Sequence, residues 1–511
     1  MHRPSRWMAR RPGPRGMSSV GLPGSLWWCG TALLGMVCLM VGGAPVLGAE
    51  PPRVAQVALD EFPDVVGLLP WRGGTALYVF TSEHKKKKRA AQFSLFAVGK
   101  GAPRLLHRWK PPGGMRHVEP WRLGGETGWL ALVGATWQIG RMRGDAPVWE
   151  ALCGCPHGYS NGGNPRRGAR SLLADLDGDG VEEFLLPGVK GLSAYRVQPE
   201  GGGGTLLWEA PWDASGKPLP APVKAHKGYS VPEYQVSDVE GDGKPDLIIP
   251  LGGALRVLPL RGTEAPVLYE AALPGLPKPS EDGRLLMLAH EDLDGDGVVD
   301  ILHADIRDFG DALDQENHLR FFPGGITGGR LRFGKATHYR QMSGGSFAQV
   351  GRGAVVGPGE KAPVWLMLAT TEVSFSTVMK ALATGEVRMK LETFAIAQGA
   401  VTPGPLHQGE VTFTHLKDEG RRPLILLADL DGDGRREYLL NLAPDALSIY
   451  PGTASNPLAE APMLVPGVVL PPSPSQVLRI HRDGAGGEAL LYWHRTPPPG
   501  GGSPALYVLE R

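Results

Sequence analysis

The sequence predicts an all-β protein, specifically a β-propeller of eight four-stranded blades, and three observations support this. The chain is rich in glycine and proline, 73 and 48 of 511 residues, and its apolar runs are short, as in strands separated by tight turns. A nine-residue acidic phrase leads into four of these runs. One kind of apolar run recurs eight times, beginning at Ala76, Trp129, Glu183, Asp246, Asp300, Val364, Glu437 and Glu488.

Residues 1–49 have the pattern of a secretory signal peptide. They contain five arginines and no acid, then an apolar run from about Leu26 to Val41, then the small residues of "GGAPVLGA". An uncleaved signal anchor is the alternative, since the apolar run is near the short end of a spanning helix. With cleavage, residues 50–511 form the mature protein, which has no stable membrane span and is secreted, periplasmic or at the cell surface.

Charge and cysteine content narrow the class of protein. Without the leader, 48 basic residues face 52 acidic ones, a net charge near −4, which argues against a nucleic-acid partner. Two of the four cysteines lie in the leader, so no disulfide framework holds the fold. The remaining pair, Cys153 and Cys155, forms a strained local disulfide or stays reduced.

The spacing of the repeat predicts the blades. Successive runs begin 53, 54, 63, 54, 64, 73 and 51 residues apart, as expected for propeller blades with loop insertions. Each unit divides into four strands, which in the third unit are "SLLAD", "EFLLPG", "LSAYRV" and "TLLWEA". Seven blades is the alternative if one weak unit is not a full blade.

The two ends of the mature chain are predicted to close the ring. The last unit supplies only three strands before the chain stops, and "RVAQVALD", Arg53 to Asp60, is available as the fourth. Such closure leaves no open edge between the first and last blades, which matters because exposed strand edges promote aggregation.

The acidic phrases are predicted to bind metal. We name them loops 1 to 4 and number each from its first aspartate. Glycine occupies position 6, and carboxylates occupy positions 1, 3, 5 and 9: Asp175, Asp177, Asp179 and Glu183 in loop 1; Asp238, Glu240, Asp242 and Asp246 in loop 2; Asp292, Asp294, Asp296 and Asp300 in loop 3; Asp429, Asp431, Asp433 and Glu437 in loop 4.

Calcium is the ion that best suits these loops, because hard oxygen ligands are spaced around a tight turn. The position 7 carbonyls are further candidate ligands, from Val181, Lys244, Val298 and Arg435. An EF-hand is excluded because position 12, which must be a bidentate glutamate there, is Leu186, Ile249, His303 or Leu440. The alternative is that the loops are simple Asp/Gly turns.

The phrase D-x-[DE]-G-D-G-x-x-[DE] before a short apolar strand resembles the FG-GAP/VCBS repeats of integrin alpha-chain propellers and many secreted bacterial proteins. The resemblance covers four units by their motif and the other four by strand pattern alone. It implies calcium binding between the first two strands of a blade, on one face of the propeller. The equivalent loops of units one, two, six and eight lack the acid set and are expected to hold no metal.

Function is expected on the opposite face, where the other connections gather. Three unusual segments fall there: "HKKKKR" from His84, "CGCPHGYSNGGNPRRG" from Cys153, and "HADIRDFGDALDQEN" from His303. The lysine run is a solvated hairpin tip or a contact for a polyanion. Three histidines, His157, His226 and His338, are assigned to loops between blades. They are unrelated surface residues or, with Cys153 and Cys155, part of a soft-metal site.

These observations favour a non-enzymatic binding or adhesion scaffold, monomeric, with structural calcium and a protein or carbohydrate ligand. The alternative is a propeller enzyme acting on an extracellular substrate such as a polysaccharide. The sequence has no nucleophile elbow, no HExxH and no paired catalytic acids outside the metal loops.

Overall fold

The computed structural model divides the chain into two units, Met1–Gly48 and Ala49–Arg511. The described residues are 52–71, 74–81, 91–99, 101–123, 126–154, 173–187, 191–197, 204–211, 234–251, 253–262, 264–276, 283–307, 316–343, 345–352, 364–371, 374–414, 425–443, 445–452, 456–471, 476–481, 487–495 and 503–511. The predicted signal peptide lies outside them. Among these residues, no helix combines the length and the hydropathy needed to cross a bilayer.

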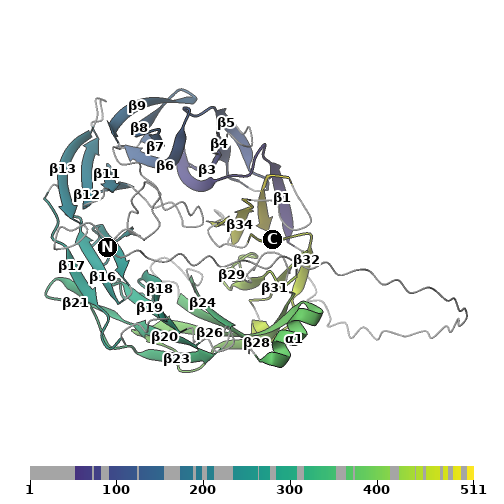
Figure 1. Ribbon diagram of the computed structural model, residues 1–511. Helices are drawn as coiled ribbons and strands as arrows, with labels where there is room; N and C mark the ends of the chain where they lie inside the picture. The colour runs from purple at the N-terminus through teal and green to yellow at the C-terminus, as the bar shows by residue number, and fades with distance from the viewer. Residues whose placement is uncertain are drawn as a thin grey trace, which may run out of the picture. The chain divides into compact units, whose positions relative to one another are not determined.

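The unit Ala49–Arg511 is an eight-bladed propeller of antiparallel four-stranded sheets, which follow one another around a ring in Figure 1. Blade 1 consists of β2 (Val65–Trp71), β3 (Gly74–Thr81), β4 (Gln92–Ala97) and β5 (Arg104–Trp109). Blade 2 consists of β6 (Met115–Leu123), β7 (Glu126–Val133), β8 (Thr136–Arg143) and β9 (Ala146–Gly154). Blades 3 and 4 consist of β10 (Leu173–Ala174), β11 (Glu183–Pro187), β12 (Gly191–Val197) and β13 (Gly204–Pro211), then β14 (Gln235–Ser237), β15 (Asp246–Leu251), β16 (Ala254–Pro259) and β17 (Tyr269–Ala272).

The second half of the ring is built in the same way. Blades 5 and 6 consist of β18 (Gly283–Glu291), β19 (Asp300–Arg307), β20 (Glu316–Phe322) and β23 (His338–Ser343), then β24 (Gly345–Arg352), β25 (Val364–Thr371), β26 (Glu386–Ala397) and β28 (His407–Thr414). Blades 7 and 8 consist of β29 (Ile425–Ala428), β30 (Glu437–Leu440), β31 (Ala446–Tyr450) and β32 (Met463–Pro466), then β33 (Val477–His481), β34 (Glu488–Trp493), β35 (Ala505–Glu510) and β1 (Arg53–Ala58).

Two sequence predictions are confirmed here. Each of the eight recurring apolar runs is the second strand of its blade, so the count is eight and the seven-blade alternative is wrong. The ring closes as expected, because β1 pairs antiparallel with β35 from Arg53 opposite Glu510 to Ala58 opposite Ala505. The backbone N–H of Leu59 extends this pairing by donating to the carbonyl of Pro504, at 2.9 Å.

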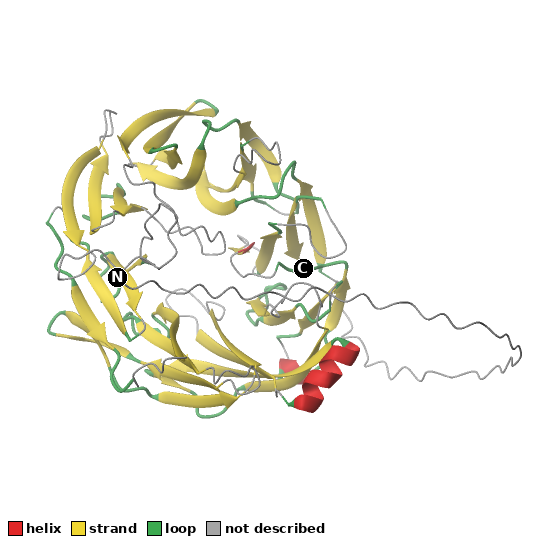
Figure 2. Cartoon of the chain, in the orientation of Figure 1, coloured by secondary structure: helices red, strands yellow, loops and turns green. Residues whose placement is uncertain are grey.

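Several short elements lie outside the repeat. Blade 5 carries an inserted hairpin, β21 (Gly324–Thr327) and β22 (Arg330–Phe333), and in blade 6 the short β27 (Ala400–Val401) pairs with β26. A 3₁₀ turn, η2, spans Pro457–Ala459. The helix α1 (Phe375–Thr384), red in Figure 2, lies between β25 and β26 along the chain. Ser374 caps it in a reciprocal capping box with Thr377. None of these elements was predicted from the sequence.

The core lies between neighbouring blades, since both faces of a blade are covered. Leu302 and Phe321 of blade 5 pack with Leu366 and Phe394 of blade 6, and every side chain of β34 is buried. Strands covered on both faces have continuous apolar sequences rather than alternating ones, which explains the recurring runs. The contact between two blades, which we call a seam, is therefore the main stabilising interface of the fold.

Candidate metal centres in the acidic loops

The four acidic loops connect the first and second strands of blades 3, 4, 5 and 7, and they share one backbone arrangement. In each, the position 1 carboxylate accepts hydrogen bonds from the N–H groups of the glycines at positions 4 and 6, at 2.7 to 3.1 Å. Both glycines have positive φ, as at Gly178 (78°) and Gly180 (83°), a conformation that disfavours other residues. The first aspartate therefore shapes the turn.

The position 9 acid begins the second strand and is buried. Glu183, Asp246, Asp300 and Glu437 are at most 1% exposed. Each accepts a hydrogen bond from the position 2 N–H of its own loop, at 2.8 to 3.0 Å. A buried carboxylate is costly unless it is hydrogen-bonded and its charge is balanced, so these acids call for a cation.

Three of the four loops gather carboxylates into a cluster that could hold a metal ion. In each cluster the ligand atoms of positions 1, 3 and 9 lie within 4.8 Å of one another: Asp175, Asp177 and Glu183; Asp292, Asp294 and Asp300; Asp429, Asp431 and Glu437. These donors fit a hard divalent cation.

The position 5 acids are exposed and lie outside these clusters. Each accepts a bond from the N–H of position 7. They and the position 7 carbonyls stay predicted ligands.

Burial and mutual repulsion raise the pKa values of the buried acids in loops 3 and 4 in the absence of a cation. The pKa of Asp300 is raised from 3.8 to about 7, first by burial and then by the charges of Asp294 and Asp296. Burial, then Asp431 and Asp429, raises the pKa of Glu437 from 4.5 to about 7. A bound cation would reverse both shifts, because it favours the charged form.

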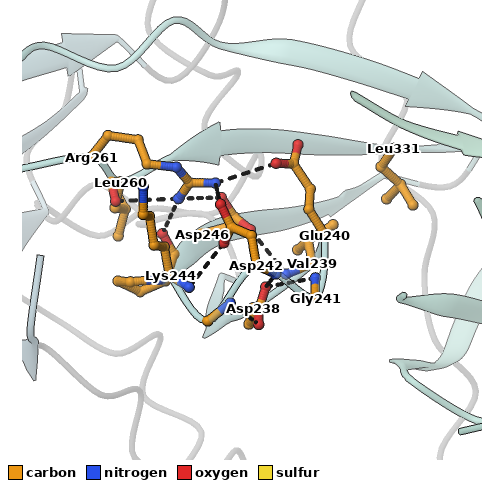
Figure 3. A network of polar contacts seen from close by, with 12 residues as sticks. Asp238, Val239, Glu240, Gly241, Asp242, Lys244, Asp246, Leu260, Arg261 and Leu331 are labelled. Atoms are coloured by element: carbon orange, nitrogen blue, oxygen red, sulfur yellow. Dashed lines mark hydrogen bonds and ion pairs between the residues drawn. The ribbon is translucent and has the colours of Figure 1, made fainter. Parts of the chain in front are cut away.

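Loop 2 differs from the other three, because the guanidinium of Arg261 enters among its carboxylates (Figure 3). Within the described part of the chain, its acids form no three-carboxylate cluster of the kind seen in loops 1, 3 and 4. Burial raises the pKa of Asp246 to about 6, and the charge of Arg261 opposes that rise. The sequence prediction of a metal site at Asp238, Glu240, Asp242 and Asp246 therefore stays a prediction, without the three-carboxylate cluster that supports it in the other loops.

Arginines also form ion pairs with loops 1 and 4, but they contact fewer carboxylates than Arg261 contacts in loop 2. Arg196 pairs with Asp177 and, at 2.8 Å, with Glu183, and Arg511 lies 3.0 Å from Asp431. In both loops the carboxylates of positions 1, 3 and 9 nevertheless stay clustered. The nine-residue phrase gives no sign of these arginines, which lie 13 to 80 residues away in sequence.

Each acidic loop also accepts a backbone N–H from the next blade. Gly262 donates to Leu176 O (2.9 Å) for loop 1, Val299 to Val239 O (3.3 Å) for loop 2, and Glu488 to Asp429 O (2.5 Å) for loop 4. In loop 3 the donor is Gly399 and the acceptor is the Asp294 carboxylate. The loops therefore lie at seams between blades as well as between strands.

The residues predicted on the opposite face are only partly described. Residues 84–89, 155–168 and 308–315, with Cys155, His157 and His226, lie outside the described residues. The described parts of the segment from His303 lie in strands: residues 303–307 end β19, and residues 316–317 begin β20. His338 is not in a loop between blades as predicted; it begins β23, packs 6.0 Å from the Phe394 ring, and burial lowers its pKa. Its sequence is part of an ordinary fourth strand.

A groove of about 500 Å³, which we call the rim groove, lies between blades 1 and 2 and was not predicted. Trp109 is held there by His107, stacked at 5.5 Å, and by a 2.5 Å hydrogen bond from its indole to Asp145 O. The lining residues are Phe93, Arg108, Trp109, Lys110, Pro111, Pro112, Ala146, Pro147 and Trp149. The available sequence signal was a tryptophan in the fourth strand of both blades.

Comparison with known proteins adds little beyond the fold. No protein-family model and no curated protein matches the chain. Among solved structures, the chain is similar to the V. cholerae biofilm matrix protein Bap1, with 11% identity, 90% of this chain and 87% of that chain covered, and a TM-score of 0.37. It is also similar to the WD40 domain of SCAP from fission yeast, with 8% identity, 90% and 98% covered, and a TM-score of 0.42. Likenesses of this strength establish neither ligand nor partner.

Proposed function

We propose that the chain is a secreted or cell-surface binding propeller whose blades are held together by calcium in loops 1, 3 and 4. The observation that carries the proposal is the gathering of three carboxylates, at least one of them buried, at each of three seams. Oxygen-only donors on a tight turn favour calcium over softer metals. The resemblance of the motif to FG-GAP/VCBS repeats agrees with this assignment.

The ions have a structural role in this proposal. Each acidic loop accepts a hydrogen bond from a backbone N–H of the next blade, so an ion that orders the loop also stiffens the seam. With dissociation constants of about 10⁻⁴ to 10⁻³ M, as in extracellular modules, millimolar calcium contributes roughly 0.4 to 1.4 kcal/mol per site. Three sites together would contribute roughly 1 to 4 kcal/mol.

Binding to a protein or carbohydrate, without catalysis, is the role we propose for the rest of the surface. The rim groove offers the indole rings of Trp109 and Trp149 beside the cationic side chains of Arg108 and Lys110. Rigid aromatic faces beside charged groups are common at binding sites. A Trp109→Ala variant should lose ligand binding in a glycan or protein array while still unfolding in one cooperative transition.

A thermal melt tests the calcium assignment directly. We expect EDTA to lower the melting midpoint of the purified mature chain, and added calcium to restore it, because the clustered carboxylates repel one another without an ion. Magnesium is the matched control and should restore less, since it prefers a smaller, more rigid octahedral site. An unchanged midpoint in EDTA would overturn the proposal.

A further inference from the structure

We propose that Arg261 is a built-in cation for loop 2, so that this loop takes no calcium while loops 1, 3 and 4 do. The inference rests on the calcium function proposed above for those three loops. It assigns a distinct role to a loop whose nine-residue phrase looks the same as theirs.

The guanidinium of Arg261 reaches three of the four loop 2 acids. Its Nη1 forms an ion pair with Asp246 Oδ1, at 3.0 Å. Its Nη2 lies 3.3 Å from Glu240 Oε2 and 3.5 Å from Asp242 Oδ2. A calcium ion needs about 2.3 to 2.6 Å to its oxygen ligands, so it cannot bind these three oxygens while the guanidinium contacts them.

Strand pairing and carbonyl contacts hold Arg261 in place. Asp246 pairs with Pro259 across β15 and β16, which puts Arg261 two residues beyond the partner of the position 9 acid. Nη1 also donates to the carbonyl oxygens of Pro245, at 2.9 Å, and Leu260, at 3.3 Å. The head group thus makes both ionic and neutral contacts, which its planar set of five donors allows.

The acid at position 3 supports the same assignment independently. It is glutamate in loop 2 and aspartate in loops 1, 3 and 4. The longer Glu240 side chain points toward Arg261 and away from Asp238 in Figure 3. Its other oxygen accepts a 3.0 Å hydrogen bond from the hydroxyl of Tyr269. Glu240 is therefore oriented toward the guanidinium rather than toward the aspartate that would share an ion.

An arginine differs from an ion in being permanent. Its charge is kept at every physiological pH and does not depend on external calcium. Loop 2 should therefore hold the seam between blades 4 and 5, through Val299 N–H and Val239 O, at calcium concentrations that leave the other loops empty.

Counting calcium per chain, by equilibrium dialysis with elemental analysis, tests the proposal. Asp292→Asn should lower the count of the wild-type chain by one, whereas the matched Asp238→Asn should leave it unchanged. Arg261→Gln should raise the count by one, and Arg261→Gln with Asp238→Asn should return it to the wild-type value. Arg256→Gln, which removes a surface ion pair with Glu270 in the same blade, is the control and should change nothing.

Two outcomes overturn the proposal: loss of an ion from Asp238→Asn, or no gain in Arg261→Gln. If the wild-type chain binds no calcium at all, the proposed function fails, and the melting midpoint in EDTA then decides the role of Arg261. In EDTA, the melting midpoint of Arg261→Gln should lie about 2 °C or more below that of Arg256→Gln, because the loop 2 carboxylates lose their counter-charge. Equal midpoints would mean that Arg261 balances nothing.

Discussion

Loops 2 and 3 have the same acid spacing, the same two glycines and the same position in consecutive blades, yet different groups meet their carboxylates. In loop 2 the group is the guanidinium of Arg261. In loop 3 two backbone N–H groups do this work: Gly324 donates to Asp300 Oδ1 at 2.8 Å, and Gly399 donates to Asp294. The two N–H groups bring no net charge to loop 3, whereas Arg261 brings one positive charge to the four acids of loop 2.

The difference arises outside the nine-residue phrase. Asp246 pairs with Pro259, and by the same pairing Asp300 lies opposite Pro323, one step beyond Ile301 and Phe322. The residue two positions further on is Arg261 in blade 4 and Gly325 in blade 5. In this proposal, the difference between loops 2 and 3 comes from the residue two positions beyond the partner of the position 9 acid.

The largest expected effect is the removal of the position 9 acid. Asp300→Ala leaves the N–H groups of Leu293, Asp294 and Gly324 without their acceptor and should lower the free energy of unfolding by about 3 to 5 kcal/mol. Asp246→Ala leaves one N–H, that of Val239, without its acceptor. It should lower the free energy of unfolding by about 2 kcal/mol. Denaturant unfolding in millimolar calcium measures both, and an equal loss in the two variants would contradict the distinction between the loops.

An arginine introduced at position 325 should give loop 3 the counter-charge that Arg261 gives loop 2. No other group lies within 4 Å of a Cβ built on Gly325, so the backbone admits a side chain there. Gly325→Arg should remove one calcium from the chain, and with it roughly 1 kcal/mol of calcium-dependent stability. Gly325→Ala is the matched control and should keep the wild-type ion count; a Gly325→Arg chain with that same count would show that the position alone does not decide.

Acid pH should stabilise the ion-free protein through loops 3 and 4. The folded-state pKa values of Asp300 and Glu437 are about 7, above their ordinary 3.8 and 4.5, so between about pH 4 and 7 the folded chain binds more protons than the unfolded chain. The contribution of these groups to stability therefore falls as pH rises through that window.

Melting in EDTA at pH 5 and pH 7.5 measures this effect. The Asp300→Asn side chain is neutral, so this variant should lose less stability than the wild type between pH 5 and pH 7.5. Added calcium at pH 7.5 should offset the loss in the wild type. For Asp246, with a pKa of about 6, the window should end lower than for Asp300. An Asp300→Asn chain with the same decline as wild type would contradict the assignment to loop 3.

The smallest effect is expected at loop 1, which is intermediate between loops 2 and 3. Arg196 pairs with Asp177 and Glu183 but leaves the cluster intact, so it should weaken calcium binding without preventing it. Arg196→Gln should tighten the affinity of loop 1 by a few fold, on the order of 1 kcal/mol, in calorimetric titration. The ion count should not change, unlike that of Arg261→Gln.

Much of the fold follows from local sequence. The apolar runs predict the second strand of every blade, because strands covered on both faces need continuous apolar residues. The missing strand of the last unit predicts closure by Arg53–Ala58, because a ring cannot leave one blade open at its edge. The turn geometry of the acidic loops is equally local, since each first aspartate accepts bonds from glycines three and five residues later.

Only the tertiary structure decided which groups contact the carboxylates of those loops. Arg261 lies 15 residues beyond Asp246, and Gly399 lies 105 residues beyond Asp294, so no pattern within nine residues could reveal either contact. The sequence by itself determined an eight-bladed ring with four acidic turns, because strand pattern and turn chemistry act over short distances. Which of those turns gathers its carboxylates for an ion was decided by pairing across strands and seams, because the balancing charge or donor comes from another part of the chain.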